Sequence, residues 1–358
     1  MPRVYYLGGF VPLALLLDAI GASAALVFVS SALGVIPAAA LMSDATEQLA
    51  EHSGPGVAGL LNVTFGNAPE LIIALFALGD GLQEVVKASL VGSVIGNSLL
   101  VLGAAMLAGG RRHQVQRFRA RAARAQGATL LIGAAALAIP SLVRLAQGDA
   151  LPSVGAPRQS FGGGLEALSI ILAALLIAVY VVGLLSSLRA GQRESGAAAA
   201  GQEPPRWSSR RALAVLAAAA VLVAIASDTL VGSVEVASHQ IGLSQFFIGL
   251  IVVAIVGNAA EHWVAVVAAA GDKMDLTVSI AVGSSAQVGL LLAPLVVLLS
   301  FVIGPSPMAM VFNGYELVAL TLAALLAAAL TARGRSTWRS GAILIAFYVA
   351  VAVVAALA

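Results

Sequence analysis

Two acidic residues of this sequence lie inside long apolar runs, at equivalent places in a repeated motif. Glu70 belongs to GNAPELIIALFAL and Glu261 to GNAAEHWVAVVAA, which share six of thirteen aligned positions. A carboxylate in a membrane helix costs roughly 2.5–3.5 kcal/mol on insertion scales, so it usually faces a cavity or a partner. The alternative is a loop residue outside the bilayer, but apolar residues continue after Glu70 and precede Glu261. We therefore predict two ion-binding carboxylates, one from each half of the chain.

Each glutamate follows an asparagine by three residues, Asn67 in the first motif and Asn258 in the second. This spacing places Asn and Glu on one face if the turn is helical. Gly and Pro around Glu70 indicate local unwinding, which would free backbone carbonyls to act as ligands. Carboxylate, amide and carbonyl oxygens are hard ligands suited to Ca²⁺, which takes six to eight oxygens at about 2.3–2.6 Å. The sequence therefore predicts Glu70, Glu261, Asn67 and Asn258 as metal ligands.

Small polar residues recur downstream of both motifs. Gly92-Ser93 and Gly283-Ser284 each lie 26 residues after their own Gly-Asn. The candidate supporting residues are Ser93 and Asn97 in the first half, and Ser284, Ser285 and Gln287 in the second. Such residues also serve helix packing in membranes, so only some of them are expected to be ligands.

Three further titratable residues are candidates for proton coupling or for lining the cavity. Glu47 and Glu235 each precede their own Gly-Asn motif, near the end of the preceding apolar run. Glu47 has the alternative reading of a solvated helix end. His262 directly follows Glu261, and imidazole titrates near neutral pH. The alternative for His262 is a hydrogen bond between helices.

The composition excludes a soluble globular domain, because 60% of the 358 residues are hydrophobic and only 10% are charged. A membrane helix needs about 20 largely apolar residues. The sequence contains eleven such runs, at 7–20, 22–42, 57–78, 85–108, 125–145, 163–188, 211–234, 243–270, 276–302, 312–331 and 340–357. The first run has the alternative of a cleaved signal peptide, although Asp18 lies within it. We therefore predict an all-α integral membrane protein.

Positive charges support this count of spans. With eleven spans, sixteen of the nineteen Lys and Arg residues fall on one side of the membrane. Only Lys87, Arg144 and Arg158 fall on the other side. By the positive-inside rule the larger group faces the cytoplasm, so the N-terminus is predicted inside and the C-terminus outside. Topology explains these charges and no stacking aromatic residues accompany them, so nucleic-acid binding is not predicted.

The polar stretch 189–210 divides the chain into two halves. Its Gly, Ala, Pro and Arg content is typical of a linker. The predicted domains are an N-terminal helix at 1–20, a five-helix repeat at 22–188, the cytoplasmic linker, and a second five-helix repeat at 211–358. The two motifs lie on spans three and eight, so the halves enter the membrane in opposite directions. Secondary transporters built from inverted repeats bind their substrate near the midplane, between the repeats.

These motifs resemble those of the calcium/proton exchanger branch of the calcium/cation antiporter superfamily. The resemblance extends to ATEQLA, GLLNVTFGN, GSVIGNSLLVLGA, VGSSAQVGLLLAP and WRSGAILIAFY. It implies that Glu70 and Glu261 are the central ligands, with Asn67 and Asn258 beside them, and that Glu47, Glu235 and His262 serve transport and proton coupling. Family members commonly carry an acidic segment between the halves. The segment from Arg189 to Arg211 has only Glu194 and Glu203 among five arginines.

The predicted activity is antiport of Ca²⁺ against H⁺ by alternating access. Two carboxylates in one site repel each other when both are ionised, so protons and Ca²⁺ compete for the same oxygens. Na⁺-driven exchange, transport of Mn²⁺ or another divalent ion, and a passive cation channel are the alternatives. An enzyme is not predicted, since no Ser-His-Asp or two-His zinc spacing is present. We expect no cofactor, a lipid bilayer as environment and a prokaryotic cytoplasmic membrane as location; a homo-oligomer is left open.

Overall fold

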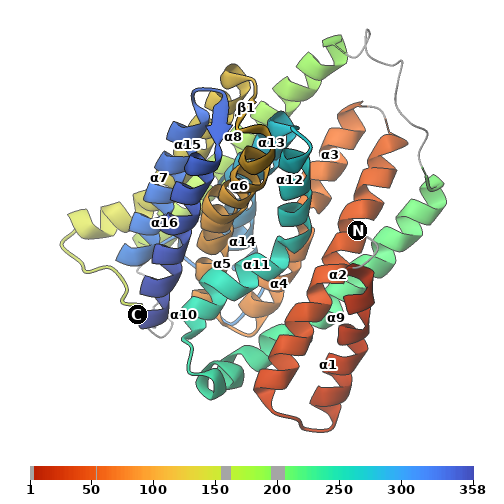
Figure 1. Cartoon of the computed structure of the whole chain (residues 1–358). Coiled ribbons are helices and arrows are strands. Elements are labelled where there is room, and N and C mark those ends of the chain that lie inside the picture. The colour runs from red at the N-terminus through yellow and green to blue at the C-terminus, as the bar shows by residue number, and fades with distance from the viewer. Residues whose placement is uncertain (1–3, 54, 155–162, 195–205) are drawn as a thin grey trace.

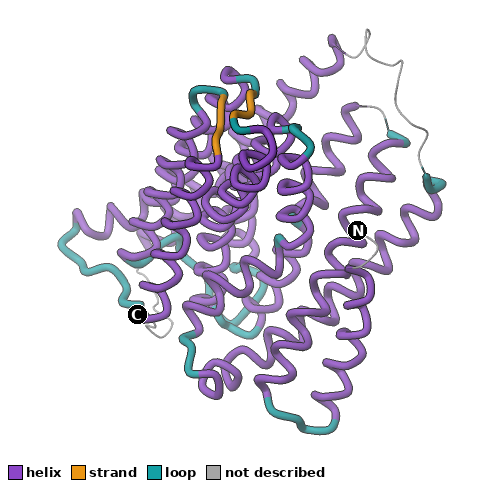
Figure 2. Tube along the Cα trace, viewed as in Figure 1, coloured by secondary structure: helices purple, strands orange, loops and turns teal. Residues whose placement is uncertain are grey.

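The computed structural model describes residues 4–53, 55–154, 163–194 and 206–358. Over these residues the protein is a bundle of helices with one small sheet, as Figures 1 and 2 show. A short 3₁₀ helix, η1 (Val4–Gly9), leads into α1 (Phe10–Ala19). The central part of the predicted linker, 195–205, and Arg158 lie outside the described residues.

The first half contains α2 (Ala24–Glu51), α3 (Pro55–Gly66), α4 (Ala68–Gly79), α5 (Gln83–Ile95), the π-helical segment η2 (Gly96–Val101), α6 (Leu102–His113), β1 (Val115–Arg117), α7 (Ala120–Ala146) and α8 (Gly163–Glu194). Helices α3 and α4 together cover one predicted span. They are bent by 42° at the break between Gly66 and Ala68. Helix α2 continues nine residues past the predicted end of its span, so Glu47 lies within a helix and not after one.

The second half contains α9 (Ser209–Ile241), α10 (Gln245–Phe247), the π-helical segment η4 (Ile248–Val253), α11 (Ala254–Gly257), α12 (Ala259–Ala270), α13 (Met274–Gln287), the π-helical segment η5 (Val288–Leu292), α14 (Ala293–Leu299), α15 (Gly314–Thr331), β2 (Arg335–Thr337) and α16 (Trp338–Leu357). The run 245–270 is bent by 61° at Asn258. Its break corresponds to the one between α3 and α4.

Eight helices of the described chain are long and apolar enough to cross a membrane, or up to ten if each bent pair is one span. The predicted count of eleven is therefore not confirmed. The predicted first span falls on the shorter apolar helix Tyr5–Ala19. This segment is too short to satisfy the length of about 20 residues that a membrane helix needs.

Small residues allow the helices of the two halves to approach closely. Helices α2 and α9 pack along one another and run side by side in Figure 1, and α1 packs on α2. A Cβ atom on Gly92 of α5 would lie 2.0 Å from the carbonyl oxygen of Leu250 in η4. Only glycine fits this crossing of α5 with η4, which is a general device of membrane helix packing. The crossing brings the α5–η2 and η4–α12 segments together at the centre of the bundle.

The two halves also pair through a two-stranded antiparallel sheet. Val115 lies opposite Thr337 and Arg117 opposite Arg335 in β1 and β2. In Figure 1 this sheet lies at the end of the bundle where α12 ends and α13 begins, and the C-terminus lies at the opposite end. Segments from the predicted cytoplasmic loops thus lie together at one end of the molecule.

Candidate functional site

Glu70 and Glu261 lie at equivalent places beside the two helix breaks. Glu70 is in the first turn of α4 and Glu261 in the first turn of α12. Asn67 and Asn258 are the residues that precede these helices, with φ angles of −98° and −102° that interrupt the helical path. A carboxylate near a helix N-terminus is favoured by the helix dipole. The Gly-Asn-Ala-x-Glu motif therefore ends one helix, starts the next and places an acid at its start.

Each carboxylate accepts a hydrogen bond from a serine 23 residues later in its own half. Ser93 donates to Oε1 of Glu70, and Ser284 donates to Oε2 of Glu261 at 2.8 Å. Both serines are buried, on α5 and α13 respectively. The repeated Gly-Ser pairs in the sequence therefore correspond to a repeated contact in space.

Hydrogen bonds across the halves join these two sets into one network. Asn258 donates through Nδ2 to Oε1 of Glu70 and, at 3.1 Å, to Ser93. Asn97 donates through Nδ2 to Oδ1 of Asn258 at 3.4 Å and to Ser284 at 3.3 Å. Glu70 and Glu261 are thus connected through Asn258, Asn97 and Ser284.

Asn67, from the first half, extends the network to further residues of the second half. It accepts at Oδ1 from Ser284 at 3.1 Å and donates through Nδ2 to Gln287 at 2.9 Å. All four predicted ligands, together with Ser93, Asn97, Ser284 and Gln287, therefore lie in one hydrogen-bonded cluster. Among the described residues no group of three or more His, Cys, Asp or Glu side chains could hold a metal ion. Any cation here would have two carboxylates plus neutral amide and hydroxyl oxygens.

One buried carboxylate oxygen in this cluster has no hydrogen-bond partner among the described residues. Oε2 of Glu70 is buried without a hydrogen bond in the described part of the chain. A cavity of about 10 Å³ adjoins Glu70, lined also by Ser89, Ser93 and Val253. This volume is of the order of a single water position. A buried, unpaired carboxylate oxygen is costly unless a cation or a proton occupies it.

The family model of the sodium/calcium exchanger proteins matches residues 23–189 and 211–357. The chain belongs to this family. The match covers residues from both halves and does not include residues 190–210.

Individual relatives and solved structures show which members of the sodium/calcium exchanger family this chain is similar to. The Ca²⁺/H⁺ antiporter of Synechocystis sp. is 39% identical over 360 residues, 96% of this chain and 94% of that protein. The Ca²⁺/H⁺ antiporter ChaA of Bacillus subtilis is 39% identical over 359 residues, 99% of both chains. The structure of native YfkE has a TM-score of 0.84 at 36% identity and covers 99% of both chains. These similarities confirm the resemblance to calcium/proton exchangers.

The H⁺/Ca²⁺ exchanger CAX has a TM-score of 0.72 at 12% identity, over 99% of this chain and 90% of that one. At this identity the likeness concerns the fold alone. It confirms the all-α membrane fold.

The remaining predicted residues of this exchanger lie outside the network. Glu47 is exposed on α2, and Glu235 is exposed on α9. Glu235 lines a pocket of about 640 Å³ together with Glu84, Ser238 and His239. No hydrogen bond joins Glu47 or Glu235 to the central cluster among the described residues. The two residues occupy equivalent positions in the two halves. Glu47 lies near the C-terminal end of α2, and Glu235 lies near the C-terminal end of α9.

His262 and Ser285 also lie outside the hydrogen-bond network that joins the two carboxylates. His262 follows Glu261 on α12, and its Nε2 is buried without a hydrogen-bond partner among the described side chains. Ser285 pairs with Ser98 at 3.0 Å and donates to the backbone oxygen of Ala281 at 2.9 Å. Ser285 therefore joins the two halves, and no hydrogen bond among the described residues links it to either carboxylate.

Sequence reasoning missed two features of the site. Ser98, the partner of Ser285, directly follows Asn97, but a lone serine gives no signal of its partner. The glycines of the motif also have a role that was not predicted. A Cβ atom on Gly257 would lie 3.0 Å from Cγ of Glu70, and one on Gly66 would lie 3.8 Å from Oε1 of Glu261. Gly257 therefore leaves room for Glu70, whereas a Cβ on Gly66 would make only an ordinary contact with Glu261.

Proposed function

We propose that this protein is a secondary active antiporter that exchanges Ca²⁺ for H⁺ by alternating access. Its relatives of 39% identity are named Ca²⁺/H⁺ antiporters over nearly their whole length. The observation that carries the proposal within this chain is the shared network of Glu70 and Glu261, with the unpaired Oε2 of Glu70.

The chemistry of the cluster suits this exchange. Two carboxylates, two asparagines and two serines offer hard oxygens of the kind that bind Ca²⁺. When Ca²⁺ is absent, protons reduce the repulsion between the carboxylates. When Ca²⁺ arrives it displaces protons from the same oxygens. Exchange follows because each ion occupies the site only when the other has left.

The position of the network between two halves suits alternating access. Glu70 and Ser93 belong to the first half, whereas Asn258 and Glu261 belong to the second. A movement of one half against the other would open the cluster to one side or the other. Transporters of inverted-repeat build use such a movement around a fixed midplane site.

We further propose the orientation that the positive-inside rule predicts. The basic loops face the cytoplasm of a prokaryotic cell, with the N-terminus inside and the C-terminus outside. Inward proton flow then drives Ca²⁺ export. Glu47 and Glu235, at equivalent ends of inverted halves, would serve at opposite mouths of the pathway, and His262 would assist proton transfer next to Glu261.

The test is Ca²⁺ uptake into proteoliposomes that contain the full chain and have an acidic interior. We expect uptake that follows the pH gradient and collapses when a protonophore is added. Uptake that does not depend on pH but follows an outward Na⁺ gradient would leave the proposed ion-binding residues unchanged. The coupling ion would then be Na⁺ and not H⁺. Flux that runs only down the Ca²⁺ gradient, without counterflow, would indicate a channel and contradict the antiport.

A further inference from the structure

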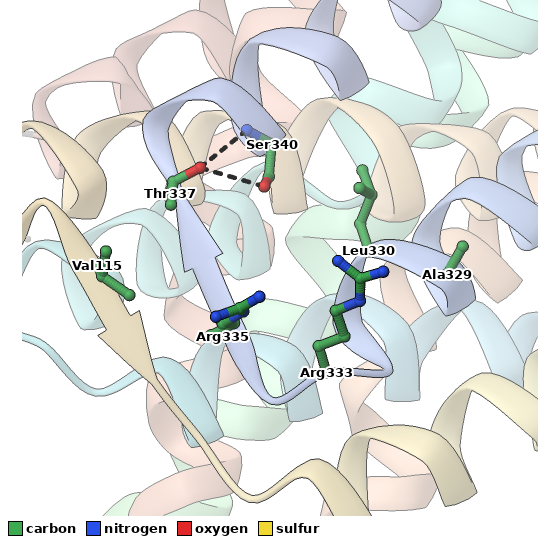
Figure 3. A pocket seen from close by; sticks show the side chains of 7 residues that line it. All are labelled: Val115, Ala329, Leu330, Arg333, Arg335, Thr337 and Ser340. Carbon is green, nitrogen blue, oxygen red and sulfur yellow. Dashed lines mark hydrogen bonds between the residues drawn. The ribbon is translucent and has the colours of Figure 1, made fainter.

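A pocket at the end of the bundle lies far from the carboxylates in the fold and has no part in the exchange described above. It has a volume of about 430 Å³ and adjoins the small sheet that joins the two halves. Its walls come from the C-terminal end of α15, from β2 and from the start of α16, and Val115 of β1 completes it (Figure 3). Both halves of the chain therefore contribute to the pocket.

The pocket is basic. Arg333 and Arg335 line it, and both are exposed. Figure 3 shows their guanidinium groups on the same side, between Leu330 and the two strands. Within the described part of the chain, neither arginine forms an ion pair and no acidic residue lines this pocket. Two guanidinium groups that share a pocket without a carboxylate favour an anionic ligand.

The strand register brings a third positive charge to this place. Arg117 of β1 lies directly opposite Arg335 of β2, and both are exposed. Like charges that face each other across a strand pair destabilise the pair. A bound anion would offset this repulsion between the two strands. The register is thus a second observation, independent of the pocket, that indicates a negatively charged occupant.

Polar groups on the opposite wall suit the same ligand. Thr337 precedes α16 and accepts a hydrogen bond from the backbone N–H of Ser340 at 3.4 Å. Thr337 and Ser340 both line the pocket. Helix α16 is 20 residues long, and its N-terminus carries a partial positive charge that attracts anions. Arginine forks, hydroxyl groups and a helix N-terminus are together the groups that bind phosphate.

The pocket also lies next to surface that suits lipid. Trp338 is 49% exposed, and the guanidinium of Arg339 lies 5.8 Å from its ring centroid. Along α16 the apolar side chains of Ile343 and Phe347 are exposed as well. Tryptophan is enriched where the membrane meets water, at the level of the headgroups. A change from Arg and Trp to apolar side chains along a helix is the pattern expected where that helix enters the membrane from the headgroup level.

We propose that this pocket binds the phosphate of an anionic phospholipid, such as phosphatidylglycerol, in the leaflet that faces the basic loops. Arg333 and Arg335 hold the phosphate, and the hydroxyl groups of Thr337 and Ser340 complete its hydrogen bonds. The acyl chains lie along the apolar surface of α16. A headgroup bound here would hold β1 and β2 together and so connect the two halves of the exchanger. Basic pockets between membrane helices on the cytoplasmic side are known to bind such headgroups.

The test measures binding to the purified full chain in a neutral detergent at fixed ionic strength. The probes are dioctanoyl phosphatidylglycerol, dioctanoyl phosphatidylcholine and inorganic phosphate alone. Binding is followed by titration calorimetry and by the shift in thermal unfolding midpoint. The variants are Arg333→Gln with Arg335→Gln, and a matched control with Arg111→Gln and Arg121→Gln. The control removes two exposed basic residues that do not line the pocket.

We expect saturable binding of the phosphatidylglycerol to the wild type and to the control, and weak binding of the phosphatidylcholine. The pocket variant should bind about 25-fold more weakly, or about fivefold for each basic side chain removed. Ala329→Glu adds an acid at an exposed position of the pocket wall and should also weaken binding. It provides a second variant if the double variant does not fold.

Three results would overturn the proposal. The first is no saturable binding by the wild type. The second is equal weakening in the pocket variant and the control, which would show only general surface charge. The third is inorganic phosphate binding as tightly as the lipid and depending on the same arginines, which would assign the pocket to a free phosphate ion. Binding is measured without transport, so these results are independent of the proposed exchange.

Discussion

Asn258, from the second half of the chain, donates a hydrogen bond to the carboxylate of Glu70, from the first half. The equivalent asparagine, Asn67, does not reach Glu261 in this way. It pairs with Ser284 and Gln287 instead. The serine contacts are therefore the same in the two halves, whereas the asparagine contacts differ. This difference leads to predictions that treat the two halves separately.

Glu70→Gln is expected to abolish Ca²⁺ transport, with a loss of at least about 100-fold. The amide keeps the size of the side chain and one acceptor oxygen for Ser93 and Asn258, but it removes the charge that a divalent cation requires. Uptake into proteoliposomes measures the loss, and size-exclusion chromatography checks folding. Asp149→Asn, at an exposed loop position, is the charge-matched control and should transport normally. Transport at the wild-type rate by the Glu70 variant would disprove the central assignment.

Asn258→Ala is expected to harm Ca²⁺ binding more than Asn67→Ala. Asn258 donates to a carboxylate, and hydrogen bonds to charged groups contribute about 1.5–3 kcal/mol, against about 0.5–1.5 kcal/mol for neutral pairs. We expect the Ca²⁺ concentration for half-maximal uptake to rise about tenfold for Asn258→Ala and about threefold for Asn67→Ala. Equal effects would indicate that the asymmetry has no functional consequence.

Gly257→Ala is expected to reduce Ca²⁺ affinity by about fivefold, whereas Gly66→Ala should have little effect. The added Cβ would lie 3.0 Å from Cγ of Glu70 in the first case and 3.8 Å from Glu261 in the second. Overpacking forces side chains from their positions at a cost of about 1–3 kcal/mol. Titration of uptake against Ca²⁺ compares the two variants. A larger effect at Gly66 would contradict the proposed contact.

Gly341→Ala is expected to lower stability without changing the ion site. Helices α6 and α16 meet at Gly103 and Gly341, where a Cβ on Gly341 would lie 2.5 Å from the carbonyl oxygen of Gly103. We expect about 1–3 kcal/mol of destabilisation. Thermal unfolding in detergent measures it. Gly232→Ala on α9 is the control, because nothing lies within 4 Å of its added Cβ; an equal loss in both variants would contradict the packing argument.

Acidic pH is expected to weaken Ca²⁺ binding. Protons neutralise the carboxylates at low pH, and neutral oxygens attract Ca²⁺ less, so the Ca²⁺ concentration for half-saturation rises as pH falls. Linkage predicts a change of up to about tenfold per pH unit for each proton displaced. Equilibrium Ca²⁺ binding at several pH values and constant ionic strength gives the slope. A slope of zero between pH 5 and 8 would contradict competition at a shared site.

Much of the architecture could be predicted from patterns that repeat along the chain. The membrane class follows from composition, because long apolar runs must pair every backbone group within a helix. Gly and Pro around Glu70 predicted the unwinding at the first motif, whereas the break at Asn258 was not predicted. The similarity to sodium/calcium exchanger proteins confirms the family. The number of spans was less predictable, since 7–20 is a short helix and 57–78 and 243–270 are each bent pairs. Apolar composition predicts how long a hydrophobic segment is, but not whether the helix it forms is straight or bent.

The sequence by itself determined which residue types are present at which spacing: Glu70 and Glu261 in equivalent motifs, each with a serine 23 residues later. Only the tertiary structure decided which half each side chain faces. Asn258 contacts Glu70 and Ser98 contacts Ser285 because α5, η2, α12 and α13 cross at the centre, and those crossings depend on close approaches such as Gly92 to Leu250. The grouping of Arg117, Arg333 and Arg335 also depends on the strand register. Contacts between distant segments arise from packing, and packing geometry is not encoded in local spacing.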